Sequence, residues 1–315
     1  MFKLIILTVL FMATQVSGAT SAVTYSLSGG RFGDNLLAYC HAKWISYSYT
    51  IPLLYKRFGY SEQLMMHLLE TPYDLALEKT FEKVIIYAPG CVIDPCAGYL
   101  YVIPYFPESM IDYSNAKFPY LFATDWADPA FKSLLRKMIA PIAPINGPQL
   151  PENYFTVALH VRKGTNWDVP HDKTTPQKLT ASLPLLFAPD SYYINQLKKI
   201  VMLVPDKSIY VHVFTDDFNP GQLAEKYRKA VDNERMIFGY RTTRNYDFLY
   251  ILDDFFALTQ FDCLIRTHSN FSFTASKLGN YTIQITPWHS TMKNNETIID
   301  QVTISIDDQS VIVTE

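Results

Sequence analysis

The sequence lacks two features that are typical of nucleic-acid and membrane proteins. Its 315 residues hold 27 Lys and Arg against 30 Asp and Glu, so no excess of positive charge is present to bind a phosphate backbone. Its N-terminal apolar run, from Leu4 to Ala13, is too short to span a bilayer comfortably. We therefore expect no nucleic-acid partner and no stable membrane span, and an anionic ligand must be bound by local groups.

The first 20 residues are typical of a cleavable secretory signal. Lys3 precedes the apolar run, and small residues follow it at positions 16–19. We expect residues 1–20 to direct the chain into the secretory pathway, to the ER or Golgi lumen or outside the cell, or to the periplasm or medium of a bacterium. A signal anchor is the alternative.

Cysteine is scarce, with four in the whole chain. Cys91 and Cys96 enclose a short segment that a disulfide would close if both were oxidised. Their spacing lacks the second Cys or His pair that a zinc site needs. Cys40 and Cys263 lie in apolar stretches, which predicts buried thiols.

Several nucleotide signatures are also missing. The segment Gly29 to Gly33 does not have the spacing of a dinucleotide-binding loop, and no Gly-Lys-Ser/Thr follows it as in a P-loop. No Asp-x-Asp motif that could hold a metal beside a nucleotide occurs in a suitable loop. We therefore expect neither a metal ion nor a cofactor.

The order of the predicted elements indicates an α/β fold. A proline-rich connector, residues 139–153, divides the chain in half. Strands and helices alternate on both sides of it, which favours parallel sheets that place ligands at the carboxyl ends of their strands. The strands are expected at 24–27, 84–88, 99–103, 155–161, 208–214 and 263–267, and the main helices at 35–48, 128–138, from about 190, 246–260 and 270–278.

Three loops follow predicted strands, and their residues resemble a known family. GGRFGDNLLAY is similar to the GRFGNQ opening of GDP-fucose-dependent fucosyltransferases, and HVRKGTNW to their His-x-Arg-x-Gly loop, closest to the protein O-fucosyltransferases. HSNFSFTASKL resembles an element of the α1,2 enzymes. Asp254, with Asp262 and Ser269, has the spacing of the core α1,6 enzymes.

This resemblance implies a GT-B fold, in which two Rossmann-type doubly wound domains face a cleft. Residues 21–145 would form the acceptor-side domain, and residues 146–315 the domain that binds the GDP-sugar. The implied activity is inverting transfer of L-fucose from GDP-β-L-fucose to a hydroxyl of a glycan or protein, without a metal. An inverting transferase for another nucleotide sugar and a secreted carbohydrate-binding protein with a degenerate donor site are the alternatives.

The resemblance assigns the central roles to the His-x-Arg-x-Gly loop. A guanidinium at Arg162 matches two phosphate oxygens and would stabilise the charge that develops on a departing diphosphate. His160 shares a strand face with Arg162 and would contact the guanosine. Gly164 completes the loop. In isolation, an arginine at a strand end is more often part of a surface ion pair, and a histidine there part of a core.

A second group of residues would hold the rest of the donor. The turn from Ser269 to Ser272, which includes Asn270 and Phe271, lies at a helix start where backbone N–H groups attract phosphate oxygens, although it could be an ordinary N-cap. Asp254 would read the guanine edge, with a solvated helix face as the alternative. The segment Thr215-Asp216-Asp217 resembles a segment of the family that would meet the ribose or the guanine, with Asp217 as the expected contact.

The glycine loop would approach the donor from the opposite domain. Its expected donor contacts come from Gly30, Arg31, Phe32, Gly33 and Asn35. For the acceptor proton, Asp34 and Asp168 are the carboxylates nearest the proposed loops, and a donor phosphate oxygen is a third candidate.

The sequence departs from the family pattern at Asp34-Asn35, Thr165 and Phe273-Thr274, which leaves the linkage open. Glycosylation sequons occur at Asn280 and Asn295. A third begins at Asn270, where a glycan would block the proposed site, so we expect Asn270 to be unmodified.

Overall fold

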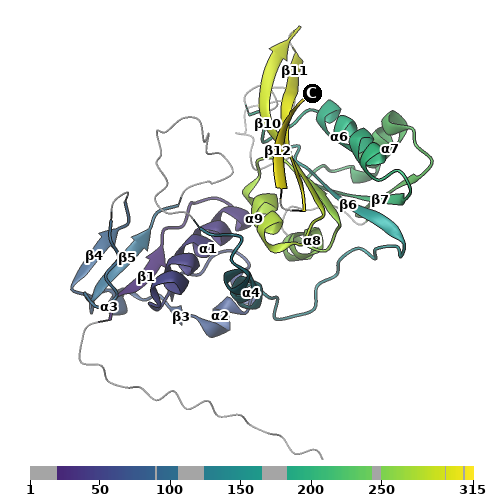
Figure 1. Ribbon diagram of the computed structural model, residues 1–315. Helices are drawn as coiled ribbons and strands as arrows, with labels where there is room; N and C mark the ends of the chain where they lie inside the picture. The colour runs from purple at the N-terminus through teal and green to yellow at the C-terminus, as the bar shows by residue number, and fades with distance from the viewer. Residues whose placement is uncertain are drawn as a thin grey trace, which may run out of the picture.

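The structure is a computed structural model that describes residues 20–88, 91–105, 124–164, 183–242, 250–294, 296–307 and 309–315. The expected signal segment up to residue 19, Asp168 and Asn295 lie outside these ranges. Parallel sheets occur in both halves, which confirms the predicted α/β class (Figure 1). Within the described ranges, no helix is long and apolar enough to cross a membrane.

The first half is built on a three-stranded parallel sheet with the order β1-β5-β4. Its strands are β1 (Ala22–Tyr25), β4 (Lys83–Ile86) and β5 (Tyr99–Ile103), and β2 (Leu54–Tyr55) pairs with β3 (Thr71–Pro72) beside it. The helices are α1 (Phe32–Tyr49), η1 (Ser61–Gln63), α2 (Met66–Leu69), α3 (Leu75–Glu78) and α4 (Pro129–Met138). The helix predicted at 128–138 is confirmed as α4, and the carboxylate of its N-cap Asp128 accepts from the N–H groups of Ala130 and Phe131.

The second half carries a seven-stranded sheet with the order β12-β11-β10-β9-β6-β7-β8. Its strands are β6 (Tyr154–Val161), β7 (Ser208–Thr215), β8 (Met236–Tyr240), β9 (Cys263–Ile265), β10 (Ile283–Lys293), β11 (Glu296–Ile306) and β12 (Gln309–Thr314). Its helices are α6 (Asp190–Leu203), α7 (Pro220–Val231), α8 (Ile251–Leu258) and α9 (Asn270–Leu278). The five neighbouring strands β8, β7, β6, β9 and β10 run parallel, whereas β11 and β12 pair antiparallel at the other edge of the sheet.

The strand order reverses between β6 and β9. From β6 the chain continues to β7 and β8 on one side, and it returns to β9 and β10 on the other. Such a reversal leaves a crevice at the carboxyl ends of the two central strands, because the connections that follow them leave in opposite directions. β6 ends at Val161 and β9 at Ile265, so the predicted loops at 162–164 and 268–270 both open at this crevice.

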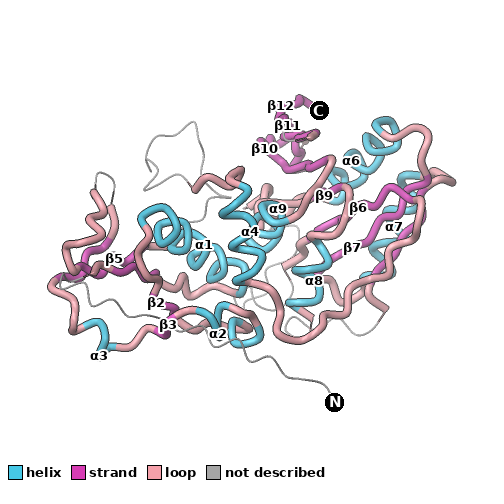
Figure 2. The backbone as a smooth tube through the Cα atoms, turned by 60° about the horizontal axis from the view of Figure 1, so that its bottom comes forward, coloured by secondary structure: helices cyan, strands magenta, loops and turns pink. Residues whose placement is uncertain are grey.

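Two apolar cores divide the faces of the large sheet. Alternate residues of β6, including Val157 and Leu159, pack under α6 and α7. Ala158, on the other face, belongs to a core that also contains residues of α1, α4, α8 and α9. This second core is shared by both halves, and two views show α9 lying between α1 and the large sheet (Figures 1 and 2). The period of two also places His160 and Arg162 on the shared face.

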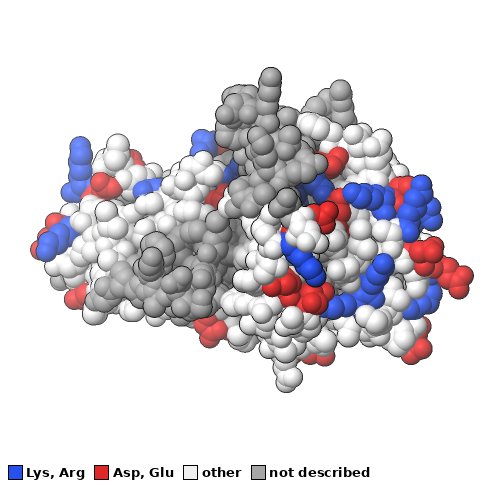
Figure 3. Space-filling model, turned by 90° about the horizontal axis from the view of Figure 1, so that it is seen from above, with Lys and Arg blue, Asp and Glu red and all other residues white. Residues whose placement is uncertain are grey.

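Charge is mixed on the surface of the described residues. On the face seen from above, basic and acidic side chains of the second half lie next to one another (Figure 3).

Candidate functional site

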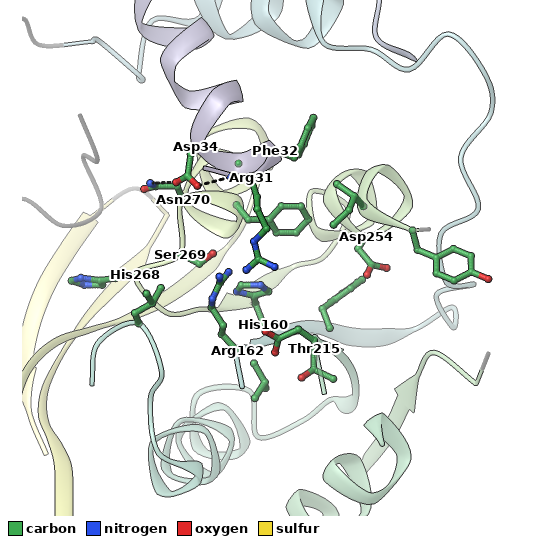
Figure 4. A pocket seen from close by; sticks show the side chains of 18 of the residues that line it. Arg31, Phe32, Asp34, His160, Arg162, Thr215, Asp254, His268, Ser269 and Asn270 are labelled. Carbon is green, nitrogen blue, oxygen red and sulfur yellow. Dashed lines mark hydrogen bonds between the residues drawn. The ribbon is translucent and has the colours of Figure 1, made fainter. Parts of the chain in front are cut away.

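A cavity of about 290 Å³ opens at the strand reversal, between the two halves (Figure 4). It is lined from the first half by the start of α1 and from the second by the ends of β6 and β7 and the starts of α8 and α9. Twelve of the predicted site residues line it: Arg31, Phe32, Gly33, Asp34, His160, Arg162, Thr215, Asp216, Asp254, Ser269, Asn270 and Phe271.

Two arginines from different halves meet in the middle of this cavity. The guanidinium groups of Arg31, at the start of α1, and Arg162, after β6, lie close together above His160 (Figure 4). The Arg162 guanidinium also lies 5.7 Å from the Phe187 ring centroid. Because like charges repel each other, the space beside these groups favours a ligand with several negative oxygens, and planar guanidinium groups match such oxygens in pairs.

His160 is a neutral ring in the wall of the cavity. Its imidazole stacks on Phe271, with centroids 5.8 Å apart and planes inclined at 30°. Burial lowers the pKa of His160 to about 3, and the charges of Arg162, Arg266 and Arg31 act in the same direction. His160 therefore remains uncharged at physiological pH, so the positive charge here comes from arginine.

The N-termini of α1 and α9 meet at the cavity because Gly33 has no side chain. A Cβ at Gly33 would lie 2.5 Å from the backbone nitrogen of Phe271 and 2.6 Å from its Cα. Helix α9 begins after Ser269, and its first N–H groups have no acceptor within the helix. The positive end of α9 therefore faces the same space as the two arginines. Gly33, expected to admit the donor, also allows close contact between α1 and α9.

A hydrogen-bonded cluster joins the halves at the rim of the cavity. Oδ1 of Asp34 accepts from Nδ2 of Asn270 at 2.7 Å and from the Tyr105 hydroxyl at 3.1 Å, and the same Asn270 nitrogen lies 2.8 Å from that hydroxyl. Oδ2 of Asp34 accepts from the backbone N–H of Arg31 at 3.1 Å. These bonds hold one carboxylate at the junction of α1 and α9, within reach of a ligand.

Two acidic side chains hold the loop after β6: Asp216, from the predicted segment at 215–217, and Asp190. Asp216 accepts from the backbone N–H groups of Lys163, at 2.6 Å, and Gly164, at 3.0 Å. Gly164 has a φ of +72°, a conformation that favours glycine. The Lys163 ammonium pairs with Asp190 at 2.5 Å, and this contact keeps it out of the cavity lining. Asp216 thus fixes the backbone that follows Arg162, and Asp190 fixes the Lys163 side chain.

The opposite end of the cavity carries a buried carboxylate. Asp254, in the first turn of α8, forms an ion pair with Arg241 beside Tyr250. Burial raises the pKa of Asp254 to about 6, and Arg241 opposes that rise. The cavity is therefore positive in its middle and acidic at this end.

The structure is similar to solved fucosyltransferases. A mutant of Arabidopsis thaliana FUT1 in complex with GDP matches over 92% of this chain and 74% of its own, with a TM-score of 0.53 and 13% identity. The chain has the fucosyltransferase fold, of the GT-B type. Matches to NodZ α-1,6-fucosyltransferase soaked with GDP-fucose (94% and 99% of the two chains, 11% identity) and to POFUT1 in complex with GDP-fucose (85% and 97%, 12%) have TM-scores of 0.45 and 0.43. No family model and no curated protein matches the sequence.

Several predicted residues support the site in this fucosyltransferase fold without lining the cavity. Gly30 leaves room for the Asp34 carboxylate, and Asn35 accepts from the backbone N–H of Ser28 at 3.2 Å and donates to the carbonyl of Gly30 at 3.0 Å. Ser272 is buried within α9. Asp217 does not line the cavity, and it accepts from the N–H of Asn219 at 2.7 Å, at the start of α7.

Sequence reasoning missed three residues of the site: Tyr105, Arg241 and Tyr250. Tyr105 and Arg241 follow the carboxyl ends of β5 and β8, so position after a parallel strand was a usable signal. Of the predicted segment at 215–217, Thr215 and Asp216 line the cavity and Asp217 does not. All four cysteines are free thiols, so the loop closure considered for Cys91 and Cys96 is absent, whereas Cys40 and Cys263 are buried as predicted.

Proposed function

We propose that the protein is an inverting, metal-independent fucosyltransferase that transfers L-fucose from GDP-β-L-fucose to a hydroxyl of a glycan or protein. One observation carries the proposal: Arg31, Arg162 and the N-terminus of α9 converge on one cavity at the strand reversal. These groups suit a diphosphate, and Asp254 at one end suits the donor edge of guanine.

The arginines would act on the leaving group. As the bond between the fucose anomeric carbon and the β-phosphate oxygen breaks, negative charge builds up on the diphosphate. Arg162 and Arg31 carry fixed positive charge to that position and need no metal for the purpose. His160, which lies beneath them, is neutral. Among the described residues, the positive charge in this part of the cavity therefore comes from the two guanidinium groups.

The acceptor hydroxyl would attack from the face opposite the diphosphate. Its oxygen bonds to the anomeric carbon as GDP leaves, so the β-linked donor gives an α-linked product. Asp34 is a candidate to take the hydroxyl proton, because its carboxylate lines the cavity and is fixed by Asn270 and Tyr105. Asp168, the second carboxylate candidate, lies outside the described residues, and a donor phosphate oxygen is the third candidate. We place the reaction in the secretory pathway or outside the cell.

Replacement of Arg162 tests the proposal. Arg162→Ala is expected to lower kcat/KM for GDP release by about 30- to 1,000-fold, because one lost electrostatic donor costs about 2–4 kcal/mol of transition-state stabilisation. Arg228→Ala removes an equal charge from an exposed pair on α7 and should leave the rate unchanged.

Two results would contradict this function. One is activity that EDTA abolishes and manganese restores. The other is binding of acceptor glycans without GDP release, together with an Arg162→Ala variant that behaves as the wild type, which would favour a carbohydrate-binding protein. A thermal-shift comparison of GDP, UDP and ADP tests the donor, since a ligand at 100 times its Kd adds about 2.7 kcal/mol to stability.

A further inference from the structure

Asp254 lies between two spaces of unequal size. Asp254 lines the main cavity, and it also lines a small cavity of about 10 Å³ together with His212 and Arg241. Arg241 lines the small cavity and not the main one, and its Nη2 contacts Oδ1 of Asp254. The Arg241 guanidinium also packs on the Tyr250 ring, 4.0 Å from its centroid. Arg241 therefore contacts the carboxylate from the side of the small cavity and does not line the main cavity.

This arrangement leaves acceptor capacity on the side of the main cavity. A carboxylate has two oxygens and about four lone-pair positions. Arg241 uses one position on Oδ1, and among the described residues no other side-chain hydrogen bond to this carboxylate occurs. The free positions can accept two N–H groups from a ligand.

The charge of Asp254 depends on its neighbours. Burial raises its pKa to about 6, the Arg241 guanidinium lowers that pKa, and Asp253 on the same helix raises it. His212, across the small cavity, adds no positive charge at neutral pH, because burial lowers its pKa to about 4. On the main-cavity side, Tyr250 contributes a phenol, and Asp216 accepts from the backbone of the loop after β6. Arg241 is thus the cation, within the described residues, that favours ionised Asp254.

Resting on the proposed function, we propose that Arg241 is a specificity-determining residue: it holds Asp254 in the acceptor-only form, so that this end of the cavity takes a nucleobase with two adjacent N–H donors. Guanine presents such an edge with its ring N–H and exocyclic amine. A neutral carboxylic acid instead offers one donor and one acceptor, which matches the ring nitrogen and amine of adenine. Loss of Arg241 should therefore weaken guanine binding and relax discrimination against adenine.

The test compares binding of GDP, IDP and ADP to the wild type, Arg241→Met, Arg241→Lys and Asp254→Asn by calorimetry at pH 5.5 and 7.5. The wild type should prefer GDP over ADP by at least about 100-fold, because a site built to bind N–H groups rejects a ligand that lacks them. IDP, which lacks the exocyclic amine, should fall between the two. In Arg241→Met the preference for GDP over ADP should be at least about tenfold smaller. Loss of the guanidinium raises the pKa of Asp254, and each unit by which that pKa exceeds the working pH lowers the ionised fraction of Asp254 tenfold.

The controls separate this inference from the proposed function. Arg241→Lys keeps the positive charge and should retain the preference for GDP. Arg228→Met removes one positive charge from the surface of α7 and should leave that preference unchanged. Asp254→Asn imitates the neutral acid and should reproduce Arg241→Met, which keeps the test decisive if Arg241→Met does not fold. In Arg241→Met, GDP affinity should also begin to fall at a higher pH than in the wild type.

If the wild type binds none of the three nucleotides, both the proposed function and this inference are overturned. If the wild type prefers GDP while Arg241→Met and Asp254→Asn keep the same ratio of GDP to ADP affinity, the role of Arg241 is overturned and the fucosyltransferase proposal stands.

Discussion

Substitution of Gly33 by alanine tests whether close contact between α1 and α9 assembles the site. The added Cβ would lie 2.5 and 2.6 Å from the backbone nitrogen and Cα of Phe271, whereas ordinary contacts begin at 3.4 Å. The helices must therefore separate by about 0.9 Å, the difference between 3.4 and 2.5 Å. Because both atoms belong to a backbone, no side-chain rotation can relieve the contact.

The expected cost follows from overpacking a tight contact. One extra carbon in a well-packed region typically costs about 1–3 kcal/mol. The higher helix propensity of alanine offsets up to about 1 kcal/mol of this cost. The change also moves Arg31 and Asp34 on α1 away from Asn270 on α9, so we expect the affinity for GDP to fall more than stability alone would suggest.

Urea unfolding and GDP calorimetry measure the two effects, and Gly59→Ala is the matched control. Gly59 is exposed, and a Cβ there would meet no atom within 4 Å, so this change should alter the free energy of unfolding by less than about 0.5 kcal/mol. If Gly33→Ala unfolds at the wild-type urea concentration and binds GDP equally well, the contact between the helices does not assemble the site.

Two further predictions concern stability. Burial lowers the pKa of His160 to about 3 and the pKa values of His212 and His268 to about 4, below the unfolded value of about 6.5. Below pH 6.5 the unfolded chain therefore binds protons that the folded chain does not. The free energy of unfolding should fall as the pH falls from 6.5 towards 4, by at most about 4 kcal/mol per pH unit for the three histidines together. Equal urea midpoints at pH 7.5 and 5.5 would contradict this prediction. Arg136 of α4 donates to the carbonyl of Leu278 at 2.9 Å, at the end of α9, so Arg136→Ala should cost about 1–2 kcal/mol in the free energy of unfolding. The neighbouring Lys137→Ala serves as control, and an equal loss in both variants would show that the bond to α9 adds nothing.

Local patterns predicted much of the second half. The apolar strand before His160 matches β6, which begins at Tyr154, and the polar turn before Asn270 matches the start of α9. These predictions succeeded because strand alternation and helix capping depend on residues close together in the sequence. Helix α8 begins at Ile251, and residues 246–249 of the longer predicted helix lie outside the described residues. Helix α1 begins at Phe32, three residues before the predicted start, with Arg31 as its N-cap.

The sequence by itself determined which residue types stand after each strand and which of them share a face, because bond geometry fixes a side chain relative to its own strand. Only the tertiary structure decided that Arg31 reaches Arg162, that Tyr105 and Asp34 meet Asn270, and that Asp216 rather than Asp217 holds the loop after β6. Those contacts depend on strand order and on the core shared by the two halves, which arise from burial of apolar surface by elements far apart in the chain.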